Sequence, residues 1–225
     1  MSKTTKNDHR KKQGNKTKIT RPILDITRTA AKELFASDSR PWDAIPKLPF
    51  FIRELGKRLP YEEYDEVSDG IWVHISAYLS PSAKIESPTI ICGGAKICHN
   101  TFISSSVIGS FASVGELSSV RNCVVFDRAK LCCHNSVSSS VIGYESILGA
   151  NSVVADMRLD GMNVSVDMPE GTYFLDKNRI GAVICDRVKI GASAVINPGS
   201  VIDTECEIFP LTSVSGYVFP YTNVK

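Results

Sequence analysis

From Ile103 to Val137 the chain reads ISSSVIGSFASVGELSSVRNCVVFDRAKLCCHNSV, and this stretch decides the fold. Aliphatic residues recur in it at intervals of six residues, interrupted by intervals of five, so that the pattern repeats every 17 residues. Such a period fits neither the helical turn of about 3.6 residues nor the two-residue alternation of a strand. It is typical of a parallel β-helix, in which each hexapeptide forms one short strand and one corner. Three hexapeptides would close one coil of a triangular prism.

The same repeat extends on both sides of this stretch. Nineteen aliphatic residues fit the repeat, which is interrupted between Val154 and Ile184. Most of them are preceded two positions earlier by a small residue, which suits a tight corner. We therefore expect an all-β fold, a parallel β-helix of hexapeptide repeats, with these side chains stacked in its core. The core residues predicted in this way are Ile85, Ile91, Ile97, Ile103, Ile108, Val114, Val120, Val125, Leu131, Val137, Ile142, Leu148, Val154, Ile184, Ile190, Ile196, Ile202, Ile208 and Val214.

The composition fits one domain with accessory segments. Of the 225 residues, 43% are hydrophobic and 22% are charged, and the net charge of +2 does not single out a polyanionic partner. No apolar run approaches the roughly 18 residues that span a membrane, and the Lys-rich start of the chain does not resemble a secretory signal. The seven cysteines show no metal-ligand CxxC spacing, so we interpret them as reduced thiols of a cytoplasmic protein.

Residues 1–70 are expected to precede the β-helix proper. Residues 1–22 carry eight basic residues and one acid, which predicts a disordered basic tail. No aromatic residue interleaves these charges, so a nucleic-acid-binding arm is not expected. Residues 23–70 form a predicted helical lead-in, with amphipathic helices at about 24–36 and 49–59. This section would pack against, or cap, the open end of the prism, because the backbone edge of a terminal coil must be covered.

Residues 71–225 are assigned to the β-helix. The repeat is lost at about 156–182, where the Asp160-Gly161 step lies between apolar residues and predicts a hairpin. An insertion that leaves a coil and returns to it is a common place for ligand contacts in repeat proteins.

Several segments resemble those of the hexapeptide acyltransferases. The resemblance is greatest to the acetyltransferase domain of bifunctional UDP-N-acetylglucosamine pyrophosphorylase/glucosamine-1-phosphate acetyltransferase and to related sugar-nucleotidyltransferase-like proteins. It implies a left-handed β-helix, a homotrimer with active sites between neighbouring subunits, acetyl-CoA as cofactor, and an amino sugar phosphate or nucleotide sugar as substrate. It does not extend to the pyrophosphorylase domain, for which the chain has no Gly-rich phosphate loop. The segments that carry the resemblance are 41–46, 126–143, 148–156, 179–186 and 196–202.

Carried over residue by residue, the family's active site is altered in this chain. The family's general base, a His, falls on Cys133, with His134 next to it. A family Tyr falls on Ser136 and a family Asn on Asp156. Two phosphate-binding lysines fall on arginines, which keep the charge and can bind phosphate through two hydrogen bonds. These two residues are Arg121 and Arg179.

The 17-residue period adds one inference about this region. His99, Glu116 and Cys133 share one phase, so they are expected to stack in a column with about 4.8 Å between coils. Glu116 would then reach His99 on one side and Cys133 or His134 on the other, which could activate a base or a thiolate. A polar outer column without a catalytic role is the alternative. In the resembled family coenzyme A lies along the later coils, where small or cyclic residues are expected to line it: Gly191, Ala192 and Pro210.

Two function hypotheses remain open from the sequence. One is an acetyl-CoA-dependent transferase in which His134 or Cys133, together with Glu116, supplies the base. The other is a catalytically silent trimer that binds a sugar nucleotide or a partner protein. A metal-dependent β-helix would need three converging histidines, and the spacing of His74, His99 and His134 does not favour one, so no metal site is predicted.

Overall fold

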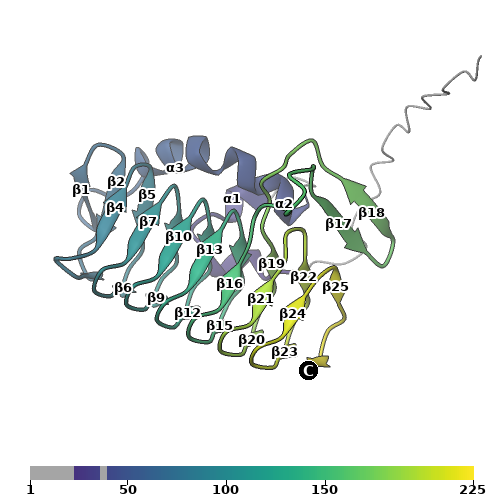
Figure 1. Ribbon diagram of the computed structural model, residues 1–225. Helices are drawn as coiled ribbons and strands as arrows, with labels where there is room; N and C mark the ends of the chain where they lie inside the picture. Colours follow the sequence, from purple (N-terminus) through teal and green to yellow (C-terminus); the bar gives the residue numbers. More distant parts are fainter. Residues whose placement is uncertain (1–22, 36–39) are drawn as a thin grey trace, which may run out of the picture.

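The computed structural model describes residues 23–35 and 40–225, so the expectation for the tail at 1–22 lies outside the described residues. The chain forms a left-handed parallel β-helix whose coils stack from β2 to β26 (Figure 1). Each coil contributes one strand to each of three sheets, here called A, B and C, and this confirms the predicted fold class.

The strands are short, as a hexapeptide repeat requires. Sheet A consists of β1 (Tyr64–Ser68), β2 (Ile71–His74), β5 (Thr89–Ile91), β8 (Val107–Ile108), β11 (Val124–Val125), β14 (Val141–Ile142), β19 (Val183–Ile184), β22 (Val201–Ile202) and β25 (Tyr217–Val218). Sheet B consists of β3 (Tyr78–Leu79), β6 (Lys96–Ile97), β9 (Ser113–Val114), β12 (Lys130–Leu131), β15 (Ile147–Leu148), β20 (Lys189–Ile190), β23 (Glu207–Ile208) and β26 (Asn223–Val224). Sheet C consists of β4 (Lys84–Glu86), β7 (Phe102–Ser104), β10 (Ser119–Arg121), β13 (Ser136–Ser138), β16 (Val153–Val154), β21 (Val195–Ile196) and β24 (Ser213–Val214).

The predicted core is confirmed. All of the repeating aliphatic residues belong to one cluster inside the prism, and Ile85 alone among them is only partly buried. The coils stay in register, as in the parallel pairing of Ile97 with Val114 and of Val114 with Leu131. Most corners contain a residue with φ near +60°. This backbone conformation is unfavourable for residues other than glycine, and the repeat imposes it at the same point of each coil.

Sheet A is covered on its outer face by other segments of the chain. The helical lead-in lies along this face (Figure 1). Its Trp42, Ile45 and Ile52 are buried in a second cluster with the outward-facing residues of sheet A. The helices of this segment are η1 (Ile26–Arg28), α1 (Lys32–Phe35), α2 (Pro41–Ala44), η2 (Ile45–Lys47) and α3 (Leu48–Gly56).

At the open end of the prism, the edge of sheet A is covered by a strand rather than by these helices. β1 pairs antiparallel with β2, whereas β3 and β4 are the terminal strands of sheets B and C. The expectation that residues 23–70 are helical is therefore wrong for residues 64–68. A hairpin that folds back on the first coil supplies the hydrogen bonds of that edge, which a helix could not do.

The insertion contains an antiparallel hairpin, but not at the predicted turn. The paired strands are β17 (Ser165–Met168) and β18 (Gly171–Phe174), which are joined by Pro169 and Glu170. The Asp160-Gly161 step forms only a local turn, with Gly161 at a φ of +67° and its N–H donating to the carbonyl of Arg158. Val164 and Val166 pack on the cluster outside sheet A, so burial of these residues, rather than turn chemistry, sets the hairpin's position.

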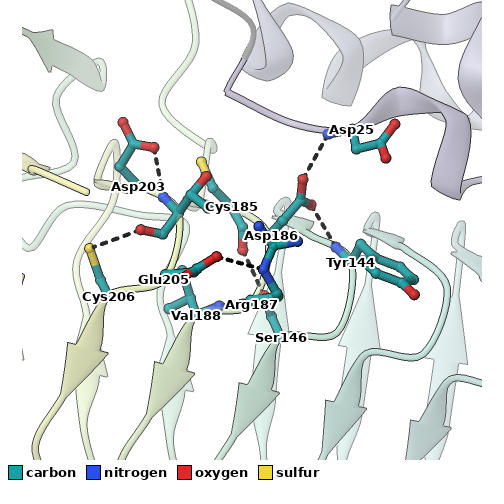
Figure 2. A network of polar contacts seen from close by, with 11 residues as sticks. Asp25, Tyr144, Ser146, Cys185, Asp186, Arg187, Val188, Asp203, Glu205 and Cys206 are labelled. Atoms are coloured by element: carbon teal, nitrogen blue, oxygen red, sulfur yellow. Dashed lines mark hydrogen bonds and ion pairs between the residues drawn. The ribbon is translucent and has the colours of Figure 1, made fainter. Parts of the chain in front are cut away.

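The start of the described chain is attached to the corner between sheets A and B by hydrogen bonds (Figure 2). The carboxylate of Asp186 accepts the N–H of Asp25 at 2.8 Å and the N–H of Tyr144 at 2.8 Å. The carbonyl of Arg28 accepts the N–H of Asp127 at 2.9 Å, and the Arg28 guanidinium lies 5.0 Å from the centre of the Tyr144 ring. Burial raises the pKa of Asp186 and of Asp127 above the ordinary value of an aspartate.

Candidate functional site

The corner between sheets B and C, here called the BC edge, carries the predicted catalytic residues. It lies opposite sheet A, the face that the helices cover. The expected column exists in the backbone: the N–H of His134 donates to the carbonyl of Glu116 at 2.8 Å, and the N–H of Leu117 donates to the carbonyl of His99 at 3.1 Å. The corners that make up the BC edge are residues 80–83, 98–101, 115–118, 132–135, 149–152, 191–194 and 209–212.

The side chains of this column do not make the contacts that the sequence suggested. Among the described residues, neither Glu116 nor His134 forms a side-chain hydrogen bond or ion pair. His99 is engaged elsewhere, with its Nδ1 atom 2.7 Å from the hydroxyl of Ser80. The expected bridge from Glu116 to His99 is therefore wrong. The corner directs consecutive side chains to different sides, which a shared phase in the sequence does not reveal.

His134 and Cys133 differ in their exposure. His134 sits at the corner position with a φ of +60° and is exposed at the BC edge, whereas Cys133 is half-buried. The neighbouring Cys132 is a free thiol and is exposed. Within residues 23–35 and 40–225, no group of three or more His, Cys, Asp or Glu side chains is arranged to hold a metal ion.

The predicted acceptor-binding residues lie on or near sheet C. Asp156 and Arg179 are brought together, with a guanidinium nitrogen 3.3 Å from a carboxylate oxygen, and the same carboxylate accepts the hydroxyl of Ser139 at 2.9 Å. Arg121 does not join them, because its guanidinium stacks 4.7 Å from the centre of the Phe102 ring. Ser136 is exposed on the outer face of β13.

The predicted cofactor-lining residues meet at the BC edge in two successive coils. A Cβ atom on Gly191 would lie 2.4 Å from the backbone nitrogen of Pro210, so a glycine is required there for the coils to stack. The carbonyl of Ala192 accepts the N–H of Leu211 at 3.0 Å. Ala192 and Pro210 are exposed, and coil stacking alone explains Gly191.

A cleft that the sequence analysis did not identify lies where the insertion leaves the coils. Its volume is about 610 Å³, within the range of small-molecule sites. The wall is the arm of residues 157–160, and the floor includes Asn197 and Gly216 of the later coils. On the arm, Arg158 forms an ion pair with Asp160 at 2.5 Å, which lowers the pKa of Asp160 to about 2. The only sequence signal for this cleft was the loss of the repeat at 156–182.

Comparisons with known proteins give a partial match. No protein-family model matches the chain. A protein of Escherichia coli strain K12 described as the putative uncharacterized acetyltransferase YaiX is 29% identical over 122 residues, which is 54% of this chain and 46% of the relative. Its counterpart in strain 536 is matched equally. The chain thus spans about half the length of the curated relatives it matches.

Solved structures resemble the chain more weakly. AntD, an N-acyltransferase from Bacillus cereus solved with dTDP and 3-hydroxybutyryl-CoA, has a TM-score of 0.35 and 14% identity over 75% of this chain and 81% of its own. PerB from Caulobacter crescentus, solved with CoA and GDP-perosamine, has a TM-score of 0.32 and 17% identity over 65% and 52%. The acetyltransferase domain of PglB from Neisseria gonorrhoeae, solved with acetyl coenzyme A, has a TM-score of 0.30 and 18% identity over 59% and 53%.

With TM-scores below 0.5, these likenesses establish neither substrate nor mechanism for this chain. No helix among the described residues is long and apolar enough to cross a membrane. The chain is a hexapeptide-repeat β-helix protein that is similar, over about half its length, to proteins described as acetyltransferases.

Proposed function

We propose that the protein is an acyl-CoA-dependent acyltransferase that acylates the amine of an amino sugar carrying a phosphate or a nucleotide. The observation that carries the proposal is the BC edge, where His134 is exposed and its side chain forms no hydrogen bond or ion pair among the described residues. The 122-residue similarity to proteins described as acetyltransferases supports the reaction class. The resemblance to the glucosamine-1-phosphate acetyltransferase domain supports the choice of acceptor.

The active sites would form between copies of the chain, as the family resemblance implies. The helices and the hairpin cover the outer face of sheet A, so sheets B and C and the edge between them remain for self-association. Leu117 and Leu211 support this, because they are 55% and 82% exposed at corner positions with φ near +60°. An exposed leucine in that conformation gains nothing in a monomer. A trimer formed at the BC edge would bring His134 to a boundary between subunits.

The chemistry proposed at this edge needs one base. The acceptor amine attacks the thioester carbonyl carbon, the carbon–sulfur bond breaks, and the amine proton passes through His134 to the departing thiolate of coenzyme A. Imidazole suits this role at neutral pH, whereas an ordinary thiol is mostly protonated there, so His134 rather than Cys133 is assigned as the base. Glu116, one coil away, would orient the imidazole once acceptor and neighbouring copy close the edge.

The acceptor's phosphate is assigned to the arginines near sheet C. Arg179 is held in place by Asp156, and Arg121 lies on the exposed end of β10. Guanidinium groups bind phosphate with charge-assisted hydrogen bonds. The 610 Å³ cleft suits a neutral part of the acceptor better, because acidic residues outnumber Arg158 in its lining. Acetyl-CoA is assigned to the BC edge of the later coils, at Gly191, Ala192 and Pro210.

The test is direct detection of coenzyme A by mass spectrometry with acetyl-CoA and a panel of amino sugars that are neutral, phosphorylated or nucleotide-linked. Direct detection is needed because the exposed thiol of Cys132 would react with thiol reagents. His134→Ala should lower the transfer rate by about 10²–10⁴. Cys133→Ser should change it by only a few-fold, and His74→Ala, far from the BC edge, is the matched control. Equal rates for His134→Ala and the unmodified protein would refute the base assignment.

A second candidate, a catalytically silent trimer that binds a sugar nucleotide or a partner protein, is favoured by one observation. Three positions that carry chemistry in the resembled family hold Cys133, Ser136 and Asp156 in this chain. Calorimetric titration with acetyl-CoA separates the two. Binding near one molecule per subunit supports the transferase, and no binding at millimolar concentration supports the silent protein.

A further inference from the structure

Two corners between sheets A and B have nearly the same sequence and different surroundings. The first, 127–131, reads DRAKL and joins β11 to β12, and the second, 186–190, reads DRVKI and joins β19 to β20. Arg128 and Arg187 occupy the same corner position, with φ of 60° and 56°. Lys130 and Lys189 both begin the following strand of sheet B. The two basic pairs therefore present the same groups in the same local geometry.

The second pair is neutralised within the chain. Arg187 forms an ion pair with Glu205 at 2.8 Å, and Lys189 forms one with Glu207 at 2.7 Å. Both acids come from the next coil, where they continue the same two columns. This corner has no cationic group left to hold an anion.

The first pair is not neutralised. Among the described residues, neither Arg128 nor Lys130 forms an ion pair. The column position next to Lys130 holds Ile147 instead of an acid. The acid next to Arg128 in this column, Glu145, forms no ion pair with it among the described residues, and its proximity raises the pKa of the Tyr144 hydroxyl. Among the described residues neither cation therefore has a carboxylate within ion-pair distance, although the charge of Arg128 does act on the neighbouring Asp127 carboxylate. An anion from outside the chain would supply a closer partner.

An exposed aromatic ring stands beside these cations. The Arg128 guanidinium carbon lies 5.8 Å from the centre of the Phe111 ring, and Phe111 is 65% exposed at a corner with a φ of +57°. A Cβ atom at position 94 would lie 2.6 Å from that ring, so the ring can occupy this position only because residue 94 is a glycine. A large aromatic residue in this conformation is costly and gains little by itself. Its exposed surface suits stacking by a flat ligand.

The ring, the two cations and Ile147 line a hollow of about 430 Å³, together with Glu145. This volume lies within the range of small-molecule sites. We propose that the hollow binds a nucleoside diphosphate, with its phosphates on Arg128 and Lys130 and its base on the Phe111 ring. Glu145 offers an acceptor to the ribose hydroxyls. The site shares no residue with the BC edge, so it does not rest on the proposed transferase activity.

The test is calorimetric titration of the full chain with ADP at low ionic strength. The double substitution Arg128→Gln/Lys130→Gln should weaken ADP binding about tenfold or more, because it removes two charge-assisted hydrogen bonds. Arg187→Gln/Lys189→Gln makes the same change in charge at the matched corner and should leave the affinity unchanged. Phe111→Ser should weaken ADP binding. Phe111→Tyr keeps the ring and should bind ADP as the unmodified protein does. Thermal unfolding of each variant checks that the exposed substitutions leave the fold intact.

Three results would overturn the proposal: no binding of ADP at millimolar concentration, equal losses in the two double variants, or inorganic diphosphate binding as tightly as ADP. UDP and coenzyme A are titrated in parallel to identify the source of the nucleotide. Coenzyme A binding that depends on Arg128 and Lys130 would assign the hollow to the adenosine diphosphate of the cofactor. Binding of UDP as tightly as ADP would assign it to nucleotides in general.

Discussion

The outer face of sheet A and the BC edge lie on opposite sides of the same prism and have opposite chemistry. Inside the prism both follow the same six-residue repeat. Outside, sheet A presents apolar residues such as Ile90, Val124 and Val201, which are buried under the helices and the hairpin. The BC edge presents Glu116 and His134, which are exposed in the part of the chain that the structure describes. The repeat therefore dictates the fold, and the residues outside the repeat dictate which side is packed and which is free to react.

Among substitutions that test this contrast, the largest loss of stability is expected at Trp42. Its side chain is fully buried between the lead-in and sheet A. Trp42→Ala should lower the free energy of unfolding by about 3–5 kcal/mol, because it leaves a large cavity in the cluster. Urea denaturation followed by circular dichroism measures it. Trp42→Phe is the control and should cost less, since the indole nitrogen has no hydrogen-bond partner among the described residues. Equal losses in the two variants would show that the ring does not stabilise the packing of this face.

The next largest effect is expected at Asp186, which connects the first described residues to the covered side (Figure 2). Asp186→Ala leaves the N–H groups of Asp25 and Tyr144 without this acceptor and should cost about 1–3 kcal/mol. It should also speed tryptic cleavage at Arg28 or Lys32. Glu205→Ala, one coil further along the same corner, is an exposed control that should leave that cleavage unchanged.

A smaller effect concerns the pH dependence of stability at the same residue. Because burial raises the pKa of Asp186, its contribution to stability is fully present below the unfolded-state pKa and is lost as pH rises through the folded-state pKa. Asp186→Asn cannot titrate, so its unfolding free energy should fall less steeply than that of the unmodified protein as pH rises above about 4. Urea denaturation at several pH values compares the two curves. Parallel curves would mean that Asp186 has no raised pKa.

The smallest effect on stability is expected at the BC edge. Leu117→Asp should change the unfolding free energy of the isolated chain by less than about 0.5 kcal/mol, because Leu117 is exposed. It should nevertheless weaken self-association if copies meet at this edge, since it would desolvate a charge at their interface. Sedimentation at a series of protein concentrations measures this. Unchanged association would remove the BC edge as the interface.

Much of the fold could be predicted from the sequence, because the hexapeptide pattern is local and repeats many times. The core residues from Ile91 to Val214 are buried as expected. The predicted position of the hairpin is wrong because the Asp160-Gly161 step carries a strong local turn signal. The actual strands, 165–168 and 171–174, depend on burial against Trp42 and its neighbours, which lie far away in the sequence.

The candidate site was less predictable, because it depends on which way each corner side chain points. The phase of Glu116 and His99 correctly placed their backbones in adjacent coils, yet His99 turned to Ser80. Asp156 and Arg179, which came from the family resemblance, do meet. For the cleft at Asn197 the sequence signalled only the loss of the repeat at 156–182, which does not identify the residues of the later coils that line it.

By itself, the sequence determined the parallel β-helix, its core and the interruption of the coils at 156–182, because a six-residue repeat has one way to bury its aliphatic side chains. Only the tertiary structure decided that the lead-in covers sheet A, that His134 is exposed at the BC edge, and that Arg128 and Arg187 differ in their partners. These outcomes rest on contacts between coils and between distant segments. Such contacts depend on side-chain direction and burial, which no local pattern of residues encodes.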